Sequence, residues 1–263
     1  MVQNQANGRR IALVLGASGD IGAATALELG DAGLDLVLSG RRRERLMEVA
    51  ERVAIRTGAV VHVVAADLTN EQAAPEIVAE AVGRFGRLDV LVSTAGEFRQ
   101  GTLLDLTSAD WTDGFAAMFF GAVRMVKTAW PYLVESHGHV VLVSGVFAIR
   151  PRTGSTLASA IAAALLNFSK SAAELGLRDG VSVNAVLPGR VSGRRLDEVL
   201  VRFSQSEGIN LADAPEAYAR YLGVERVARP EEIGKLIAFL ASDAGSYIRG
   251  ASVVIDGGAT RAL

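Results

Sequence analysis

Short runs of branched apolar residues alternate along the whole chain with longer amphipathic segments. Most of the short runs are continuous in Val, Ile and Leu, which indicates parallel strands covered on both faces. The predicted strands are Ile11–Leu15, Leu34–Leu38, Val60–Val64, Val90–Ser93, Val140–Ser144, Val181–Val186 and Ser252–Ile255. The helices predicted between them span 20–31, 43–56, 71–84, 108–135, 155–176 and 230–241. This alternation predicts an α/β fold with a doubly wound parallel sheet.

The chain length favours one domain over two. A chain of 263 residues suits a single large α/β domain and is long enough to bury a sheet on both faces. We therefore treat 1–263 as a single domain. Within it, the segment 193–222 has mixed charge, loose periodicity and no strand pattern. We expect this segment to be an irregular insertion between a strand and a helix.

Three of the predicted helices carry recognisable start signals. Thr69 with Gln72, and Thr107 with Asp110, have the spacing of a capping box, in which two side chains satisfy backbone N–H groups reciprocally. Pro230, followed by two Glu residues, is a favoured first helical turn. These signals predict helix starts close to residues 71, 108 and 230.

Composition excludes several classes of site and partner. The absence of Cys excludes disulfides, thiol chemistry and Cys-bound metals. Two of the three His, His137 and His139, flank Gly138 in what we interpret as a polar turn, so no metal site is predicted. The formal net charge of -2 gives no reason to expect nucleic acid as a partner. With no signal-peptide core and no apolar run long enough to span a bilayer, we expect a cytoplasmic protein without a membrane partner.

A glycine-rich turn joins the first predicted strand to the first predicted helix. Its sequence is Gly16-Ala17-Ser18-Gly19-Asp20-Ile21-Gly22. Glycines at this place permit a tight turn and a close approach of the backbone to a ligand. The start of the helix then offers free N–H groups and a positive dipole end to a phosphate. The turn predicts a dinucleotide site with contacts at Gly16, Ser18, Asp20, Ile21 and Gly22.

This turn and four later motifs, in the same order, resemble the short-chain dehydrogenase/reductase family. The later motifs are Asp67-Leu68-Thr69, Ser93-Thr94-Ala95-Gly96, Val183-Asn184-Ala185-Val186-Leu187-Pro188-Gly189, and Phe239-Leu240-Ala241-Ser242-Asp243 followed by Asp256-Gly257-Gly258. The turn departs from the family pattern T-G-x-x-x-G-x-G at Leu15 and Asp20, and the motif N-N-A-G has lost both Asn. The resemblance implies a Rossmann-like fold, a nicotinamide cofactor and a small-molecule ligand or substrate.

The resemblance also implies further cofactor contacts and an assembly. Asp67 and Leu68 correspond to the family's adenine side, and Pro188 with Gly189 to its nicotinamide side. Thr94, Ala95 and Gly96 follow the fourth strand, where the family carries a further cofactor motif. Family members commonly form dimers or tetramers through the two long helices that correspond to 108–135 and 155–176, so we expect a homo-oligomer.

Two arginines at the end of the second predicted strand bear on the choice of cofactor. An acidic residue at this place would bind the ribose 2′-hydroxyl of NAD. The chain instead has Arg41 and Arg42, whose guanidinium forks suit a 2′-phosphate. Alternatively, these arginines form only a solvated basic start to the next helix. We predict NADP(H), with NAD(H) as the alternative.

The resemblance implies that the family's acid–base positions lack their usual side chains in this chain. Ser144 to Pro151 runs in step with the family's strand-five motif and sets Gly145 at the place of the catalytic Ser. Counting back from Val183-Asn184 sets Ala158 at the place of the Tyr and Ala162 at that of the Lys, which need i, i+4 spacing to share a helix face. Counting from Trp111 sets Met118 at the place of the Asn.

Few neighbours offer a substitute for the missing acid. Ser144 precedes the Ser position and, on a strand, should point the other way. A shift of register would bring Thr156 or Ser155 to the Tyr position, but their hydroxyls are poor acids. Glu97 is the one carboxyl close to the expected nicotinamide end, so it is the candidate catalytic residue. Arg150, Arg152 and Arg190 are loop cations that we expect on the rim.

Three functional hypotheses follow from this pattern. The first is an atypical oxidoreductase with a non-standard proton donor. The second is a non-redox enzyme, such as a lyase, dehydratase or isomerase, on the same pocket. The third is a catalytically silent NADP(H)-binding partner subunit. Loss of a positioned general acid typically lowers a rate by about 10²–10⁴-fold, which weighs against ordinary carbonyl reduction. We favour the first hypothesis because of the family's usual activity, which is an argument by analogy.

Overall fold

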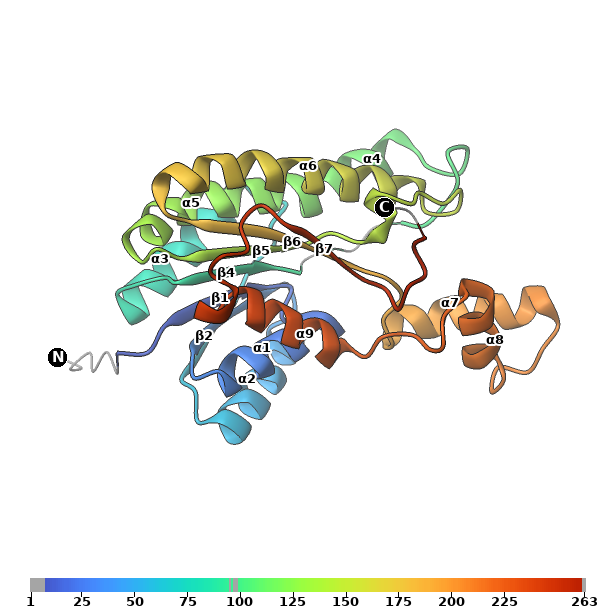
Figure 1. The fold of residues 1–263 in the computed structure, drawn as a ribbon, viewed down its shortest axis with the longest axis horizontal. Coiled ribbons are helices and arrows are strands. Elements are labelled where there is room, and N and C mark those ends of the chain that lie inside the picture. The colour runs from blue at the N-terminus through green and yellow to red at the C-terminus, as the bar shows by residue number, and fades with distance from the viewer. Residues whose placement is uncertain (1–7, 95, 97–98, 262–263) are drawn as a thin grey trace.

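A computed structural model describes residues 8–94, 96 and 99–261. Seven strands form one parallel sheet in the order β3-β2-β1-β4-β5-β6-β7, with helices on both faces (Figure 1). The strands are β1 (Ile11–Leu15), β2 (Asp35–Gly40), β3 (Val61–Ala65), β4 (Val90–Ser93), β5 (His139–Val143), β6 (Ser182–Pro188) and β7 (Ser252–Ile255). The predicted doubly wound, Rossmann-like sheet is confirmed, and every strand lies within two residues of its predicted bounds.

The helices divide between the two faces of the sheet. On one face lie α3 (Ala73–Phe85), α5 (Gly121–Glu135) and α6 (Thr156–Asp179), while α1 (Asp20–Asp31), α2 (Arg43–Thr57) and α9 (Pro230–Leu240) cover the other (Figure 1). Two apolar clusters therefore sandwich the strands. Residues such as Leu13 and Leu91 point into the first, and Val14 and Val92 into the second, because successive strand side chains face opposite ways.

The helix-start signals were correct at two of three places. Thr107 and Asp110 form the predicted capping box at the start of α4 (Ser108–Gly114), and Pro230 begins α9. The capping box predicted for Thr69 and Gln72 is wrong. The hydroxyl and N–H of Thr69 both donate to Oδ1 of Asp67, at 2.9 Å each, and α3 begins only after Gln72. A carboxylate two residues away forms a local turn that competes with the cap.

The long helix predicted over 108–135 contains a wider turn. A π-helical segment (η1, Phe115–Phe120) separates α4 from α5 and carries Met118. Such segments often occur at functional sites. The prediction of a polar turn over 137–139 is wrong at His139, because this residue begins β5 and is buried.

The prediction of an irregular segment over 193–222 is wrong as well. The segment does lie between a strand and a helix, β6 and α9, but it holds two helices, α7 (Arg194–Glu207) and α8 (Ala214–Leu222). Leu196 and Leu200 recur at helical spacing on α7 and pack against Tyr218 and Leu222 of α8. Interspersed charged residues hide this period in the sequence, yet they lie on the outer face of an amphipathic helix. The helix pair projects from one end of the molecule (Figure 1).

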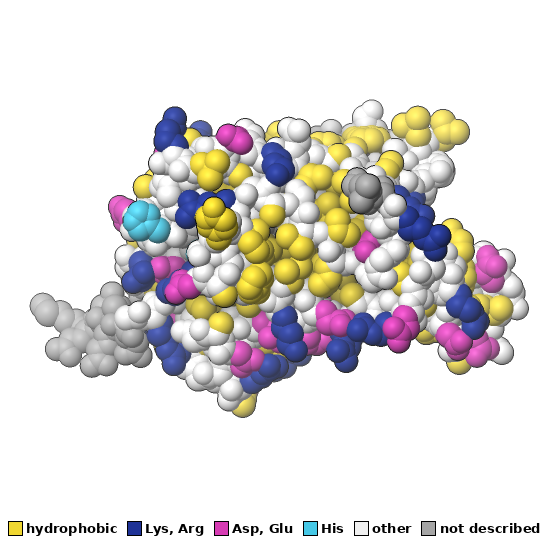
Figure 2. Space-filling model, viewed as in Figure 1, with side chains coloured by type: hydrophobic (Ala, Val, Ile, Leu, Met, Phe, Trp, Pro, Cys, Tyr) yellow, Lys and Arg dark blue, Asp and Glu magenta, His cyan; other side chains and the backbone are white. Residues whose placement is uncertain are grey.

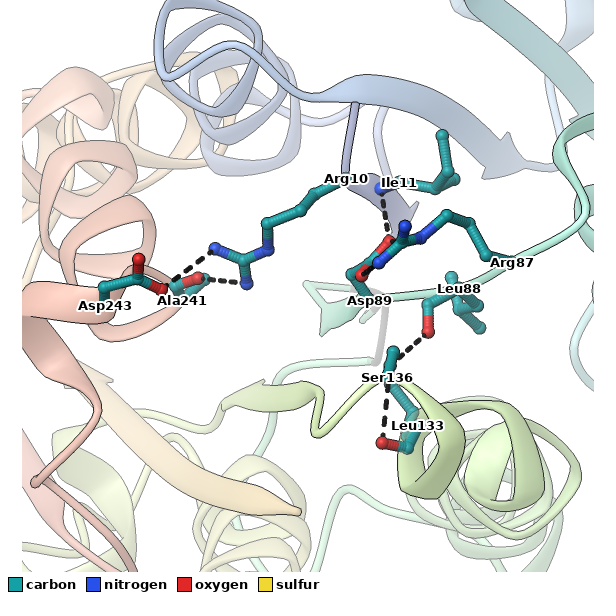
Figure 3. A network of polar contacts seen from close by, with 9 residues as sticks. All are labelled: Arg10, Ile11, Arg87, Leu88, Asp89, Leu133, Ser136, Ala241 and Asp243. Carbon is teal, nitrogen blue, oxygen red and sulfur yellow. Dashed lines mark hydrogen bonds and ion pairs between the residues drawn. The ribbon is translucent and has the colours of Figure 1, made fainter. Parts of the chain in front are cut away.

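Asp89, just before β4, links the amino-terminal ends of strands β1 and β4 by hydrogen bonds. The carboxylate of this buried residue accepts a hydrogen bond from the N–H of Ile11 at 2.7 Å and from Nε of Arg87 at 2.9 Å (Figure 3). Close by, the guanidinium of Arg10 donates to the carbonyl of Ala241 at 2.7 Å (Figure 3). These polar contacts lie at the opposite edge from the carboxyl ends of the strands, and so they support the sheet without entering the site.

The C-terminal elements leave apolar side chains exposed around the sheet edge formed by β7. Phe239, Tyr247 and Val254 are exposed, and Figure 2 shows hydrophobic side chains gathered over the middle of the face on which β7 lies. Charged side chains line the lower margin of the same face (Figure 2). Within the described residues, no helix combines the length and apolar character that a membrane crossing requires.

Candidate active site

A cavity of about 570 Å³ opens at the carboxyl ends of the strands. It spans the place where the strand order reverses between β1 and β4, which is where open α/β sheets bind their ligands. The turn Gly16–Gly22 lines one part, and residues that follow β2, β3, β4, β5 and β6 line the rest. Residues on α6 and α7 complete the wall. One cavity therefore contacts almost every motif that the sequence singled out.

The glycine-rich turn is held close to the sheet by its backbone. The N–H groups of Gly16 and Ala17 donate to the carbonyl of Ser39 at the end of β2, at 2.8 and 3.2 Å. Gly16 has φ 73°, a conformation that favours glycine. A Cβ atom on Gly22 would lie 2.8 Å from Cα of Ala17 and also overlap the Gly16 carbonyl oxygen. No side chain caps α1, whose first turn is therefore available to a phosphate.

The turn after β3 presents Asp67, Leu68 and Thr69 to the same cavity. The N–H of Thr69 donates to Asp67 and lowers the pKa of its carboxyl, and the hydroxyl of Thr69 and the charge of Arg41 lower this pKa further. Oδ1 of Asp67 makes both bonds to Thr69. The turn thus uses one carboxylate oxygen and leaves the other to accept a ligand donor.

Arg41 and Arg42 line the cavity next to this turn, and both side chains are exposed. Helix α2 begins only at Arg43, so the two arginines belong to the loop that leaves β2. Their position is compatible with both interpretations of the sequence, a phosphate-binding pair and a basic helix start. They border the cavity and also directly precede α2. A guanidinium at this place offers a planar fork to a phosphate.

The segment after β4 binds to the neighbouring strand. The N–H and hydroxyl of Thr94 both donate to the carbonyl of Leu15, at 3.0 and 2.8 Å, which holds the ends of β4 and β1 together. Gly96 lines the cavity against Met118, whose Cε would lie 2.6 Å from a Cβ atom on Gly96. Ala95 and Glu97 lie outside the described residues.

The turn after β6 contributes Pro188 and Gly189 to the wall. The N–H of Gly189 donates to the carbonyl of Ile255 at 2.9 Å, so the turn is anchored to β7. A Cβ atom on Gly189 would lie 2.7 Å from Cβ of Asp256, and this close packing requires glycine. Pro188 and Gly189 therefore line the same cavity as the glycine-rich turn.

The structure brings Met118, Gly145, Ala158 and Ala162 together on the wall of the one cavity. Ala158 and Ala162 are one helical turn apart on α6 and are both buried. Gly145 has φ 150°, a conformation that side-chain-bearing residues rarely adopt. The loop after β5 has therefore taken a backbone conformation that suits glycine and disfavours Ser.

The hydroxyls closest to these residues are partly engaged elsewhere. Ser144 lines the cavity, contrary to our expectation, but its hydroxyl donates to the carbonyl of Ala162 at 2.9 Å. Ser155 also lines the cavity, whereas the hydroxyl of Thr156 donates to the carbonyl of Thr153. Lys170 contacts the carbonyl of Gly250 and does not line the cavity.

Sequence reasoning missed the contribution of α7. Arg194, Arg195 and Glu198 line the cavity from its N-terminal half, and Arg202 follows one turn later. Arg195 donates to the carbonyl of Gly96, and Arg202 donates to Oε1 of Gln100 at 3.0 Å. These bonds attach α7 to the segment after β4. The helical period of the apolar residues on α7 is the signal that could have revealed this wall.

Of the three cations expected on the rim, only Arg190 lines the cavity, and it is half-buried. Its guanidinium carbon lies 5.1 Å from the ring centroid of Phe147 and 5.9 Å from that of Tyr218. Arg150 contacts the carbonyl of Ala259, and Arg152 lies over the ring of Tyr221 at 6.0 Å. In the described part of the chain, no three His, Asp or Glu side chains gather into a group that could hold a metal ion.

Comparisons with known proteins agree with this architecture. Residues 16–260 match the family described as enoyl-(acyl carrier protein) reductase. The chain is 34% identical to the cis-4-hydroxycyclohexanecarboxylate dehydrogenase of Sinomonas cyclohexanicum, over 97% of this chain and 98% of that protein. The structure of L-sorbose reductase from Gluconobacter frateurii, complexed with NADPH and L-sorbose, has a TM-score of 0.92 and 25% identity, with 97% and 98% of the two chains covered.

A further solved structure is similar in fold. It is the NADPH-bound short-chain oxidoreductase of Pseudomonas aeruginosa PAO1, described as containing an atypical catalytic center. Its TM-score to this chain is 0.89 at 26% identity, and the match covers 97% of this chain and 98% of that chain.

Proposed function

This chain belongs to the short-chain dehydrogenase/reductase family, and we propose that it is an NADP(H)-dependent oxidoreductase whose proton donor differs from the family's Tyr. The observation that carries this proposal is the single cavity that runs from Arg41 and Arg42 to Ala158 and Ala162. Its first part suits a phosphorylated dinucleotide. Its far part lacks the phenol and the ammonium that the family uses, because both positions hold Ala.

The residues of the cavity fit an NADP(H) molecule by their chemistry. The first turn of α1, with Gly16, Ser18, Asp20, Ile21 and Gly22, would hold the pyrophosphate, and Asp67 with Leu68 the adenine. Arg41 and Arg42 would bind the 2′-phosphate. When bound, the cofactor supplies or accepts a hydride. Solved structures of two similar proteins, the L-sorbose reductase and the Pseudomonas oxidoreductase, contain NADPH and support this assignment.

The fit at the nicotinamide side rests on two turns. Thr94 and Gly96 follow β4, Pro188 and Gly189 follow β6, and both pairs line the cavity. Ala95 is assigned to the same set by its position in the sequence. Close packing at Gly189 and Gly96 keeps side chains out of this space, so the backbone can approach a flat ring.

We assign the proton transfer to Glu97 on its place in the sequence. Glu97 directly follows Gly96, which lines the cavity and packs against Met118. A carboxyl is a recognised general acid or base. The engaged hydroxyl of Ser144 supports this choice, because its proton is directed to the carbonyl of Ala162. The insertion with α7 and α8 forms the substrate side of the cavity, since α7 lines it.

The reaction class follows from the relatives. The Sinomonas relative is a dehydrogenase of a hydroxycyclohexane carboxylate, and the Gluconobacter protein reduces a sugar. Both names describe the interconversion of an alcohol and a carbonyl compound. We therefore propose the same interconversion for a small-molecule substrate of this protein.

A cofactor titration followed by a turnover assay tests the proposal. Purified protein is titrated with NADPH and NADH by calorimetry, and then assayed for NADPH oxidation with a panel of ketones and aldehydes. We expect saturable NADPH binding, slow turnover with unselected carbonyl compounds, and loss of that turnover in Glu97→Gln. Binding without turnover on any compound would favour a silent binding subunit, and no binding of either cofactor at millimolar concentration would exclude the proposal.

We also propose that the protein is a homo-oligomer, a dimer or a tetramer, assembled through the segments 108–135 and 155–176. Phe120 and Leu175 on these segments, and Leu177 directly after the second, are exposed large apolar residues, which supports an apolar contact there. Light scattering coupled to size-exclusion chromatography measures the mass directly. A monomeric mass at micromolar concentration would contradict this assembly.

A further inference from the structure

Arg190 is a cation enclosed by aromatic rings at the substrate end of the cavity. It follows Gly189 after β6 and lines the cavity with Gly145 and Phe147. Its guanidinium carbon lies 5.1 Å from the ring centroid of Phe147 and 5.9 Å from that of Tyr218. Two aromatic side chains, Phe147 and Tyr218, thus contact this charge near position 145.

Two further cations, Arg152 and Arg202, act on the charge of Arg190. Burial lowers the pKa of its guanidinium, and the charges of Arg152 and Arg202 lower it further, while Tyr218 acts in the opposite direction. No carboxylate of the described residues lies within ion-pair distance of Arg190. Glu198 lines the cavity without such a pair to Arg190.

A half-buried cation without a counter-ion is unfavourable, because it loses part of its water and gains no opposite charge. Stacking on aromatic faces compensates this loss only in part. Arg is retained at such places where it recognises a planar anion, since its fork matches the two oxygens of a carboxylate. Arg190 therefore lacks a counter-ion among the described residues, and the carboxylate of a ligand would supply one.

We propose that the substrate of this protein is a carbonyl or hydroxy compound that carries a carboxylate, and that Arg190 binds this carboxylate. The inference rests on the proposed function, because it takes the other end of the cavity to hold the nicotinamide cofactor. Arg190 is 45 residues beyond Gly145 in the sequence, yet both line the same end of the cavity. Arg152 and Arg202 add a positive field that attracts the anion.

Matched pairs of ligands test this inference. The NADPH-loaded protein is titrated by calorimetry with 2-oxo and 3-oxo acids of increasing chain length, each beside its methyl ester. We expect at least one acid to bind about tenfold or more tightly than its ester, since hydrogen bonds to charged groups are the strong ones. A phosphonate of the same chain length shows whether the site prefers the planar anion.

Variants assign the preference to Arg190. Arg190→Met keeps a long side chain next to the two rings but removes the charge. We expect the affinities of this variant for acid and ester to differ by no more than about twofold, because the preference for the acid depends on the charge. Arg190→Lys should retain part of the preference as a point charge. Arg84→Met is the matched control, because Arg84 also stacks on a ring, that of Phe85 at 5.5 Å, on the distant helix α3.

The outcomes separate this inference from the proposed function. The NADPH titration comes first, and failure there contradicts the proposed function. If NADPH binds but every acid and ester bind equally, or none binds at millimolar concentration, the carboxylate assignment is wrong and the cofactor assignment stands. An unchanged preference in Arg190→Met also overturns it. The wild-type comparison needs no variant, so the inference can be tested even if Arg190→Met does not fold.

Discussion

The hydroxyl of Ser144 donates a hydrogen bond of 2.9 Å to the backbone carbonyl of Ala162. This bond joins the loop after β5 to α6 within the wall of the cavity. Because the acceptor is a backbone atom, the bond is independent of the side chain at position 162. A longer side chain can therefore be introduced there without breaking the link between β5 and α6.

This relationship makes it possible to test the proposal that Ala158 and Ala162 occupy the family's acid–base positions. In Ala158→Tyr with Ala162→Lys, a phenol and an ammonium would lie one turn apart on α6 and enter the cavity. We expect the double variant to increase NADPH-dependent reduction of simple ketones by about 10²-fold or more, the range for a positioned general acid. Ala158→Phe with Ala162→Met has similar volume without either group, and turnover as high in this variant would mean that the gain is not acid catalysis.

Adding Gly145→Ser to that pair should not help. Gly145 has φ 150°, a backbone conformation that residues with side chains rarely adopt. Holding Ser in this conformation would destabilise the folded protein by about 1–3 kcal/mol. We expect a lower free energy of unfolding than in the double variant, measured by urea denaturation, and no further increase in ketone reduction. A triple variant of equal stability and higher activity would show that the loop relaxes to accept Ser.

Gly22 should be essential for cofactor binding. A methyl group there would lie 2.8 Å from Cα of Ala17, so Gly22→Ala must displace the turn that begins α1. We expect the NADPH affinity measured by calorimetry to fall at least about tenfold, because the N–H groups at the helix start would no longer converge on a phosphate. Gly83→Ala is the control. Nothing lies within 4 Å of a Cβ there, and this change should stabilise α3 by about 0.5–1 kcal/mol and leave NADPH binding unchanged.

The cofactor preference should depend on Arg41 and Arg42. Both line the cavity, and each phosphate contact from a guanidinium contributes about 1.5–3 kcal/mol. Replacing both with Ala should weaken NADPH binding more than NADH binding, and lower the ratio of the two affinities at least about tenfold. Arg43→Ala tests the neighbouring charge at the start of α2, which does not line the cavity. Equal weakening of NADPH and NADH would show that the arginines act only on the helix start.

The start of α9 should make stability dependent on pH. Arg226 donates to both carboxylate oxygens of Glu232 at 2.7 and 2.8 Å, and the N–H of Arg229 donates at 2.8 Å. These bonds, that of Arg226 first, lower the pKa of Glu232 to about 2. Because the folded pKa lies below the value of 4.5 for the free side chain, the stabilisation is complete above pH 4.5 and is lost as the pH falls toward 2.

Urea denaturation of Glu232→Gln across this range measures the effect. We expect the variant to be less stable than the wild type at pH 7 and the difference to shrink between pH 4.5 and pH 2. Glu231→Gln changes a charge in the same first turn and serves as the matched control. A difference between wild type and Glu232→Gln that stays constant with pH would contradict the assigned ion pair.

The sequence by itself determined the sheet, the glycine-rich turn and the motifs that border the cavity. Strands such as Ile11–Leu15 are continuous apolar runs. The turn requires glycine at positions 16 and 22 for local steric reasons. The strands and the turn can therefore be predicted from a few neighbouring residues. The identities at 145, 158 and 162 are likewise sequence facts, and the structure brings these positions together on one cavity wall.

Only the tertiary structure decided what surrounds those positions. The φ of Gly145, the engagement of Ser144 by Ala162, and the position of Arg190 next to Phe147 and Tyr218 depend on contacts between segments far apart in the chain. Helix α7 reaches the cavity because its apolar face packs on α8. Local periodicity shows which residues share one face of a helix or strand. Packing of the whole chain decides which element covers that face, and which charged side chains lack a counter-ion.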